Sequence, residues 1–304
     1  MISLKQLTYA LAVQDTRHFK QAAERCFVSQ STLSSAIAEL EAQLGVQLFE
    51  RDNKKVLITS IGEQILSRAQ NVLTQIHDIE QLAKSQSEPL SQPMRLGVIP
   101  TIGPYLLPKV LPTLREQYSG FALSLAEEQS AVLVDQVRRG VLDTAIIALP
   151  YPVAGLLSFP FWQEDFFAVC HKDAELASLS HIDHTSLENT SLLLLKEGHC
   201  LTDHALSVCH MPRPQQDNAF AGTSLFTLVQ MVAGKMGATL VPEMALDVLL
   251  TGYQELTAMH LDEPGPHREI AFIMRPNYAG MSDIETLMAL FKKTLSSFSC
   301  TSKS

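Results

Sequence analysis

The stretch SQSTLSSAIAELEAQLG, residues 29–45, limits what this chain can fold into more than any other part of the sequence. It starts with Ser29, a residue type that caps helices, and ends with Gly45, a type that stops them. Its apolar residues recur at steps of four and three, at Leu33, Ile37, Leu40 and Leu44. This period predicts an amphipathic helix with one buried face.

The residues before this helix predict further helices, so that helices fill most of residues 4–45. HFKQAAERC, residues 18–26, fits a short helix, and a brief turn separates it from Ser29. A short helix, a tight turn and a second helix form the helix-turn-helix pattern. The other face of the second helix starts small and polar, with Gln30, Ser31, Ser34 and Ser35. Pattern alone leaves a small helical bundle with a solvated polar face as an equal alternative.

The next segment, VQLFERDNKKVLITSIG (46–62), alternates apolar and polar residues around a turn at Asp52–Asn53. This pattern predicts a two-stranded wing. Arg51, Lys54 and Lys55 then surround its tip, where basic side chains suit contact with DNA phosphates. Each of them could equally be ordinary surface charge.

Residues 61–88 predict one long helix of roughly 40 Å. Its apolar residues follow a heptad spacing, at Ile65, Ala69, Val72, Ile76, Ile79 and Ala83. A heptad seam predicts that two chains pair along this helix. SQSEPLSQP, residues 85–93, then predicts a linker, because its prolines stop the helix.

From Met94 onwards, short apolar runs alternate with helical patterns, which predicts an α/β domain with a mostly parallel sheet. The runs are MRLGVIP (94–100), LDTAIIAL (142–149), DFFAVC (165–170), SLLLLK (191–196), GATLVP (237–242) and EIAFIMRP (269–276). About 210 residues are many for one such sheet, so two lobes are expected. Ligands of such folds bind where strands end and helices begin, and Thr101 occupies that kind of position.

Composition limits the partners and the compartment. The net charge of −9 argues against nucleic-acid binding by the whole protein, but residues 1–60 hold seven Lys and Arg against six Asp and Glu. A near-neutral N-terminal unit with local basic clusters can still contact phosphates. No run of 18 apolar residues and no secretory signal pattern is present, so we expect a cytoplasmic protein. Five scattered cysteines do not make a structural disulfide framework.

The stretch EGHCLTDHALSVCHM, residues 197–211, concentrates Cys200 and Cys209 with His199, His204 and His210. Zinc is disfavoured because the short paired clips of structural zinc sites are absent, so no metal and no cofactor are expected. A peroxidase-like enzyme would give a DNA-binding unit no role, which argues against an enzyme. A further alternative is that the cysteines are unreactive core residues. We interpret Cys26, Cys170 and Cys300 in this way.

Local geometry gives the two cysteines of this stretch different properties. LTDHALSVC predicts a helix, so Cys200 lies at a helix N-terminus, where backbone dipoles lower a thiol pKa. A thiolate can attack a peroxide bond and form a sulfenic acid. Cys209 is nine positions away, roughly 13 Å along a helix and on the opposite face. A disulfide needs Cα atoms within about 7 Å, so the pair can bond only if the helix unwinds.

The first 60 or so residues resemble the LysR-type transcriptional regulators through HFKQAAERCFVSQSTLSSAIAELEAQLGVQLFER. The resemblance implies a winged helix-turn-helix at 1–60, a dimerising linker helix and hinge at 61–93, and a two-lobed regulatory domain like the periplasmic binding proteins at 94–304. Lobe I is then expected at 94–164 and 269–304, and lobe II at 165–268. It also implies that residues of the second helix and the wing contact double-stranded DNA. These residues are Gln30, Ser31, Thr32, Ser35, Arg51, Lys54 and Lys55.

GVIPTIGPYLLP (97–108) and EGHCLTDHALSVC (197–209) resemble the peroxide-sensing activators of that family. These activators usually have Arg at the position of Thr202 and Thr at the position of Ser130, so this chain departs from them at both positions. The resemblance implies that hydrogen peroxide oxidises Cys200, that Cys209 resolves it as a reversible disulfide, and that antioxidant genes respond. It implies a peroxide pocket at Thr101, Ser130, His199, Cys200, Asp203 and Arg268. The implied partners are RNA polymerase, a thiol reductant and further copies of the chain, which form a homotetramer arranged as a dimer of dimers.

A second regulator hypothesis stays open. In it, a LysR-type protein responds to a small organic ligand in the cleft between the lobes. Thr101 and Ser130 would then bind a carboxylate, and the response would not require Cys200.

Overall fold

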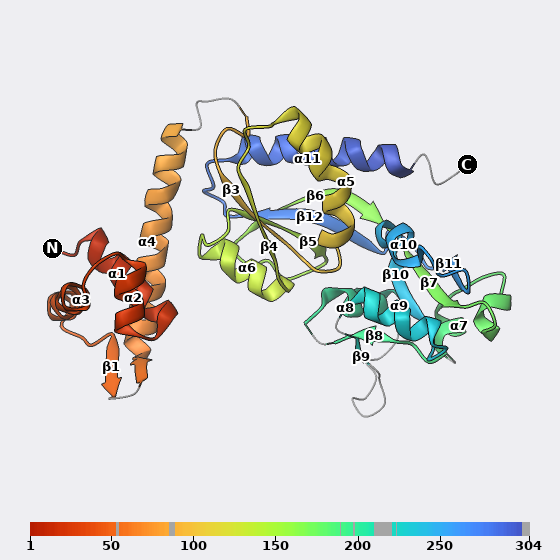
Figure 1. Ribbon diagram of the computed structural model, residues 1–304, viewed down its shortest axis with the longest axis horizontal. Coiled ribbons are helices and arrows are strands. Elements are labelled where there is room, and N and C mark those ends of the chain that lie inside the picture. The colour runs from red at the N-terminus through yellow and green to blue at the C-terminus, as the bar shows by residue number, and fades with distance from the viewer. Residues whose placement is uncertain are drawn as a thin grey trace. The chain divides into compact units, whose positions relative to one another are not determined.

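A computed structural model gives the structure of residues 1–52, 55–84, 89–188, 190–196, 198–209, 221–222 and 224–299 (Figure 1). The chain divides into two compact units, Met1–Gln86 and Ser87–Ser304. No helix in these described ranges is long and apolar enough to cross a membrane.

The first unit is a winged helix-turn-helix followed by a long helix, as the sequence predicts. Its elements in chain order are α1 (Leu4–Thr16), α2 (Phe19–Arg25), α3 (Gln30–Leu44), β1 (Phe49–Asp52), β2 (Lys55–Ile58) and α4 (Ser60–Lys84). The two strands pair antiparallel and form the wing.

Helix α3 begins and ends where its sequence signals predict. The Ser29 hydroxyl accepts a hydrogen bond of 3.1 Å from the Thr32 N–H and so caps the helix. Gly45 ends it with a φ of 69°, a left-handed conformation that favours glycine. The apolar face packs into the core of the unit and is fully buried at Leu33, Ile37 and Leu40. The polar face is therefore left to solvent.

The heptad positions of α4 divide into two groups. Ile65 and Ala69 pack into the core of their own unit, where α1 contacts α4. Val72 and Ile79 are 40% and 66% exposed. Val72 and Ile79 are thus open within a single chain, and the pairing of this helix with a second chain stays a prediction.

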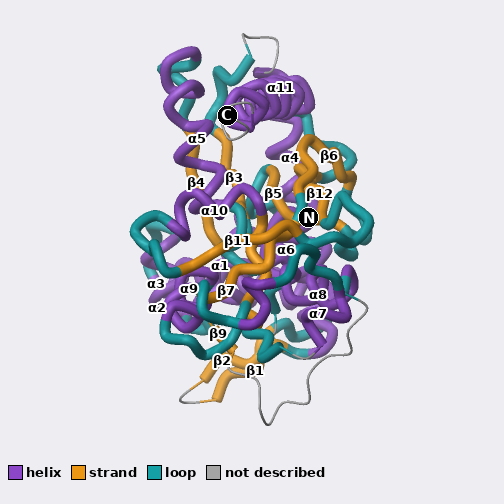
Figure 2. The backbone as a smooth tube through the Cα atoms, turned by 90° about the vertical axis from the view of Figure 1, so that its right-hand side faces the viewer, coloured by secondary structure: helices purple, strands orange, loops and turns teal. Residues whose placement is uncertain are grey.

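The second unit contains two lobes, of which lobe I is built on a five-stranded sheet of order β4-β3-β5-β12-β6. The strands are β3 (Met94–Val98), β4 (Leu123–Glu127), β5 (Thr144–Leu149), β6 (Leu157–Glu164) and β12 (Arg268–Met274). Its helices are α5 (Gly103–Gln117), α6 (Ser130–Arg138) and α11 (Met281–Ser299). Helices α5 and α11 lie side by side (Figures 1 and 2), and α6 contacts β5 and β12.

Lobe II is built on a three-stranded sheet of order β10-β7-β11 and a short two-stranded sheet. The strands are β7 (Phe166–His171), β8 (Leu194–Leu195), β9 (Ala221–Gly222), β10 (Thr239–Pro242) and β11 (Leu256–His260). Its helical elements are η1 (Glu175–Ser178), α7 (His184–Glu188), α8 (Cys200–Val208), α9 (Leu225–Ala233) and α10 (Glu243–Leu250). The chain enters this lobe after β6 and leaves it before β12.

The prediction of a mostly parallel sheet is wrong. Strands β4, β3 and β5 run parallel, but β12 pairs antiparallel with both β5 and β6. In lobe II, β7 pairs antiparallel with β10 and with β11. A short apolar run indicates that a strand is buried on both faces, but it carries no information about direction. Direction is set here by the two passages of the chain between the lobes.

Candidate functional site

Cys200 is the first residue of α8, with His199 at the cap position before it. This confirms the predicted place of Cys200 at a helix N-terminus. The residue is only 4% exposed and belongs to the hydrophobic core of the second unit. A reactive group at this place is therefore shielded from solvent.

Three other predicted residues gather around Cys200 from lobe I. Thr101 precedes α5, Ser130 begins α6 and Arg268 begins β12, and all three are at most 3% exposed. Ser130 and the charge of Arg268 both lower the pKa of the Cys200 thiol, so both side chains lie close to it. Residues that are at least 68 positions from Cys200 in the sequence thus join it in one buried cluster.

An ion pair holds Arg268 in this cluster. Its Nη2 and Nε atoms lie 2.6 and 2.8 Å from Glu164 Oε1, and both side chains are buried. Nη2 also donates to the Thr101 carbonyl at 3.2 Å, and Nη1 lies 3.5 Å from the Thr101 hydroxyl. The other Glu164 oxygen accepts from the Met244 N–H at 2.8 Å. The sequence analysis missed Glu164, because a carboxylate that ends an apolar strand has no local signal for its distant partner.

Burial raises the pKa of the Cys200 thiol. The Ser130 hydroxyl, the charge of Arg268 and the backbone at Ala148 and Cys200 lower it by smaller amounts. The prediction of a lowered thiol pKa is therefore wrong for this arrangement, because desolvation of a thiolate outweighs the helix N-terminus.

The Ser130 hydroxyl is close enough to the Cys200 sulfur to lower the pKa of the thiol. Ser130 Oγ nevertheless makes no regular hydrogen bond to Cys200 or to any other residue that the structure describes. A buried hydroxyl without a regular partner retains hydrogen-bonding capacity that a small polar ligand could use.

His199 and Asp203 flank the cluster differently. His199 is half-buried, and burial lowers its pKa, which favours the neutral ring. Asp203 lies in the first turn of α8 with an exposed side chain. Its charge raises the pKa of Tyr151, after the larger effects of burial and of Cys200. Tyr151 is thus a neighbour of the site that the sequence analysis missed, and Asp203 lies at the edge of the buried cluster.

His204 connects α8 to lobe I. Its Nε2 lies 2.9 Å from the carbonyl oxygen of Pro150, and the residue is 4% exposed. A carbonyl oxygen only accepts, so Nε2 carries the proton and the buried Nδ1 is left without a partner. Burial is the largest of the effects that lower the His204 pKa. Its position four residues after Cys200 was an available signal, because such residues share a helix face.

Cys209 ends α8 and is 1% exposed. Burial, and then the charge of Glu263, raise its pKa to about 11. Cys26, Cys170, Cys200 and Cys209 are all free thiols. Because α8 is a regular helix between Cys200 and Cys209, the two are roughly 13 Å apart along its axis.

Contacts on both sides fix the beginning of α8. The Thr202 hydroxyl donates to the Leu195 carbonyl at 3.0 Å, which ties α8 to β8. Gly198 has a φ of 97°, and a Cβ atom there would lie 2.5 Å from the Gln129 side chain. Glycine is therefore required by the backbone conformation, whereas the end of the flexible Gln129 side chain can move aside.

Replacing Gly198 by alanine is expected to lower the free energy of unfolding by about 1–3 kcal/mol, because the backbone conformation becomes strained. Gly120→Ala is the matched control, since nothing lies within 4 Å of a Cβ atom there and its φ is not left-handed. We expect its effect to stay within about 0.5 kcal/mol. Urea denaturation of both variants measures the difference, and equal stabilities would contradict the requirement for glycine at 198.

The predicted DNA-contacting residues of α3 lie together on its surface. Gln30, Ser31, Thr32 and Ser35 are all exposed in the first two turns. The Ser29 hydroxyl lies 2.8 Å from the hydroxyls of both Ser31 and Thr32, which orders the start of the helix. Of the predicted wing residues, Lys54 lies outside the described residues, and so do the side chains of Arg51 and Lys55.

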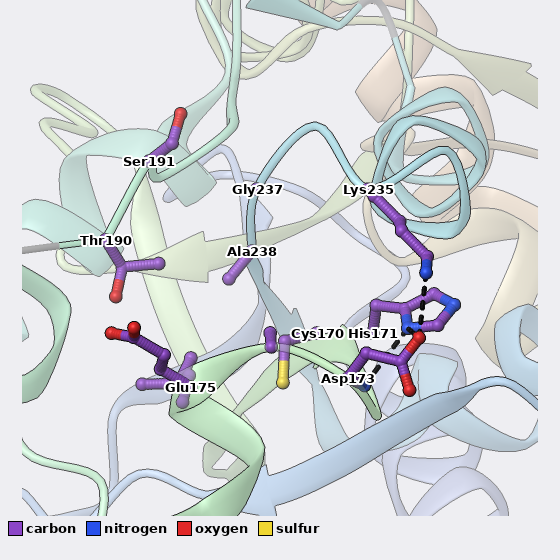
Figure 3. Close-up of a pocket in the computed structure, with 11 residues that line it drawn as sticks. Cys170, His171, Asp173, Glu175, Thr190, Ser191, Lys235, Gly237 and Ala238 are labelled. Atoms are coloured by element: carbon purple, nitrogen blue, oxygen red, sulfur yellow. Dashed lines mark hydrogen bonds and ion pairs between the residues drawn. The ribbon is translucent and has the colours of Figure 1, made fainter.

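The described part of the chain holds no group of three or more metal-ligand residues, while His210 and Cys300 lie outside the described ranges. A cavity of about 350 Å³ in lobe II is lined by Cys170, His171 and Lys235, among others (Figure 3). Lys235 is paired with Asp173 at 2.7 Å at this cavity. None of the predicted site residues lines it.

Comparisons with known proteins match a family model to each of the two units. The model of bacterial regulatory helix-turn-helix proteins of the lysR family matches residues 4–63, and the LysR substrate binding domain matches residues 87–296. The chain is 38% identical to the HTH-type transcriptional regulator EstR of Acinetobacter baylyi over 96% of each chain. It is also 38% identical to a probable hydrogen peroxide-inducible genes activator of Streptomyces viridosporus, over 96% of this chain and 94% of the other.

A solved structure is similar over nearly the whole length. It is a full-length OxyR from Pseudomonas aeruginosa with a cysteine-to-aspartate substitution. The two chains are 34% identical, with 96% of this chain and 95% of the other covered and a TM-score of 0.80.

Proposed function

Because the chain belongs to the LysR family of bacterial transcriptional regulators, we propose that this DNA-binding regulator senses hydrogen peroxide through Cys200 and activates antioxidant genes. The observation that carries the proposal is the environment of Cys200, a buried thiol at a helix N-terminus beside the Ser130 hydroxyl and the Arg268 charge. The peroxide-responsive relative and the OxyR structure support the same sensing function.

In the first step, the Cys200 thiolate attacks one peroxide oxygen, and the O–O bond breaks. Cysteine becomes a sulfenic acid, and the departing hydroxide takes a proton and leaves as water. Ser130 and Thr101 are the hydroxyl donors at the site, with His199 beside them. Arg268 favours the thiolate through its charge.

In the second step, the Cys209 thiol condenses with the sulfenic acid, and a disulfide and water form. The Cα atoms must come within about 7 Å, so the roughly 13 Å of α8 between them has to unwind. Unwinding removes buried side chains of α8 from the core, among them Leu201, Ala205 and Leu206. Oxidation is thereby converted into a rearrangement of lobe II that changes how the DNA-binding units of an assembled tetramer are held. A thiol reductant reverses it, and contact with RNA polymerase transmits the response.

The experiment that tests this function follows peroxide-dependent transcription from a promoter fragment that the protein binds, with wild type, Cys200→Ser and Cys170→Ser. We expect Cys200→Ser to abolish the response and Cys170→Ser to preserve it, because Cys170 is a buried cysteine outside the cluster. Mass mapping under non-reducing conditions should recover Cys200 and Cys209 in one linked peptide. A full response in Cys200→Ser, or both thiols intact after peroxide, would refute the proposal.

A regulator of a small organic ligand is the second candidate, because residues 87–296 match the LysR substrate binding domain. Against it, Thr101 and Ser130 are 3% and 1% exposed, and Arg268 already contacts Thr101. This candidate predicts that Cys200→Ser retains a response to its ligand and that peroxide has no effect on wild type.

A further inference from the structure

Phe27 differs from the other phenylalanines of the first unit because its side chain is 96% exposed. Phe19 and Phe49 are 8% and 3% exposed, and their rings contact each other in an edge-to-face arrangement. Burial of an aromatic ring is among the largest sources of stability available to a small unit. The fold of the unit therefore gains nothing from the ring of Phe27.

The backbone of Phe27 is also unfavourable for this residue type. Its φ is 54°, in the left-handed region that glycine and asparagine occupy far more readily. Hydrogen bonds hold it there, from the Phe27 N–H to the Glu24 carbonyl at 3.1 Å and from the Val28 N–H to the Ala23 carbonyl at 3.0 Å. Strained conformations of this kind cluster at functional positions. Exposure and strain at one residue are independent signs that phenylalanine serves something other than folding.

Phe27 lies in the turn between α2 and α3, two residues before the Ser29 cap and three before Gln30. We propose that its ring is a DNA contact, which packs against deoxyribose carbons or a thymine methyl group beside the bases that the start of α3 faces. DNA is the occupant that fits this position, because the exposed face of Gln30, Ser31 and Thr32 begins directly after the turn. A thymine methyl group and the sugar are the apolar surfaces that DNA offers there.

The contact would differ from the others at this face in its chemistry. Gln30, Ser31 and Thr32 offer hydrogen bonds, and the wing offers positive charge, whereas Phe27 offers apolar area. An apolar contact releases no counterions, so its loss leaves the salt dependence of DNA affinity unchanged. Loss of a phosphate contact reduces that dependence.

The test compares full-length Phe27→Asn and Phe27→Tyr with wild type on a DNA duplex that the wild-type protein selects from a random-sequence pool. Asparagine tolerates the left-handed backbone, so Phe27→Asn is expected to fold with an unchanged or higher melting temperature. Its affinity should fall at least about tenfold, the size expected when an aromatic side chain loses its apolar contact. Phe27→Tyr retains the ring and should bind within about twofold of wild type, with the same salt slope in all three proteins.

Leu4→Asn is the control, because Leu4 is also an exposed apolar residue of this unit, at 48%, and lies outside the turn. It should leave DNA affinity unchanged. Unchanged affinity in Phe27→Asn would overturn the proposal. So would a changed oligomeric state, which assigns the ring to a second copy of the chain, or a loss of transcription at normal affinity, which assigns it to a protein partner.

Discussion

Replacing Arg268 by methionine is expected to cost about 3–5 kcal/mol of unfolding free energy, because it leaves Glu164 as an unpaired charge in the core. The two side chains are 0% and 1% exposed, so water cannot take the place of the guanidinium. The double variant Arg268→Met/Glu164→Gln removes both charges and retains an oxygen for the Met244 N–H. It should recover most of the lost stability. Urea denaturation of the three proteins measures this directly.

The same double variant also tests the role of Arg268 in the oxidation of Cys200, because its folding stability is expected to be restored. Without the charge of Arg268, the pKa of the Cys200 thiol rises further and the thiolate becomes rarer. We expect peroxide to oxidise Cys200 at least about tenfold more slowly, which corresponds to a pKa shift of one unit or more. Stopped-flow oxidation followed by alkylation and mass spectrometry measures the rate. Oxidation of the folded double variant at the wild-type rate would exclude Arg268 from the reaction.

Replacing His204 by leucine is expected to destabilise the reduced form by about 1–3 kcal/mol, because the buried Pro150 carbonyl loses its donor. Helix α8 then opens more easily, and the disulfide should form faster after oxidation, by about tenfold for each 1.4 kcal/mol lost. His204→Gln is the matched variant, since its amide can donate to the same carbonyl. If leucine and glutamine behave alike, the hydrogen bond to Pro150 does not hold α8.

His204 also predicts a dependence of stability on pH. Burial lowers its pKa in the folded protein below the ordinary value of about 6.5. Its contribution to stability is therefore present above the unfolded pKa and is lost as the pH falls below it. We expect wild type to lose stability relative to His204→Gln as the pH falls from about 7 to 5. His184 and His260 have raised pKa values and act in the opposite sense, but both proteins contain them, so the difference isolates His204. A constant difference across this range would contradict the prediction.

The candidate site could be located from the sequence because its signals are local. Ser29, the apolar spacing of α3 and Gly45 predict a helix within one segment, and the structure confirms it. The start of α8 at Cys200 follows in the same way from neighbouring residues. Periodicity and capping act over a few residues, so they can be inferred without knowing the rest of the fold.

Properties that depend on burial could not be predicted in this way. The helix N-terminus at Cys200 predicted a lowered pKa, but the core around the thiol raises it. The hydrogen bond of His204 could not be predicted either, because its partner Pro150 is 54 residues away. The direction of β12 was likewise decided by the passage of the chain between the lobes.

The sequence by itself therefore determined the winged helix-turn-helix, the nine-residue spacing of Cys200 and Cys209, and the helix that keeps them apart. Only the tertiary structure decided that Arg268 is neutralised by Glu164, that His204 ties α8 to lobe I, and that Phe27 stands in solvent. The physical reason is the distance along the chain over which each kind of interaction acts. Helix formation depends on neighbours along the chain, whereas desolvation and ion pairing depend on which distant segments exclude water from a group.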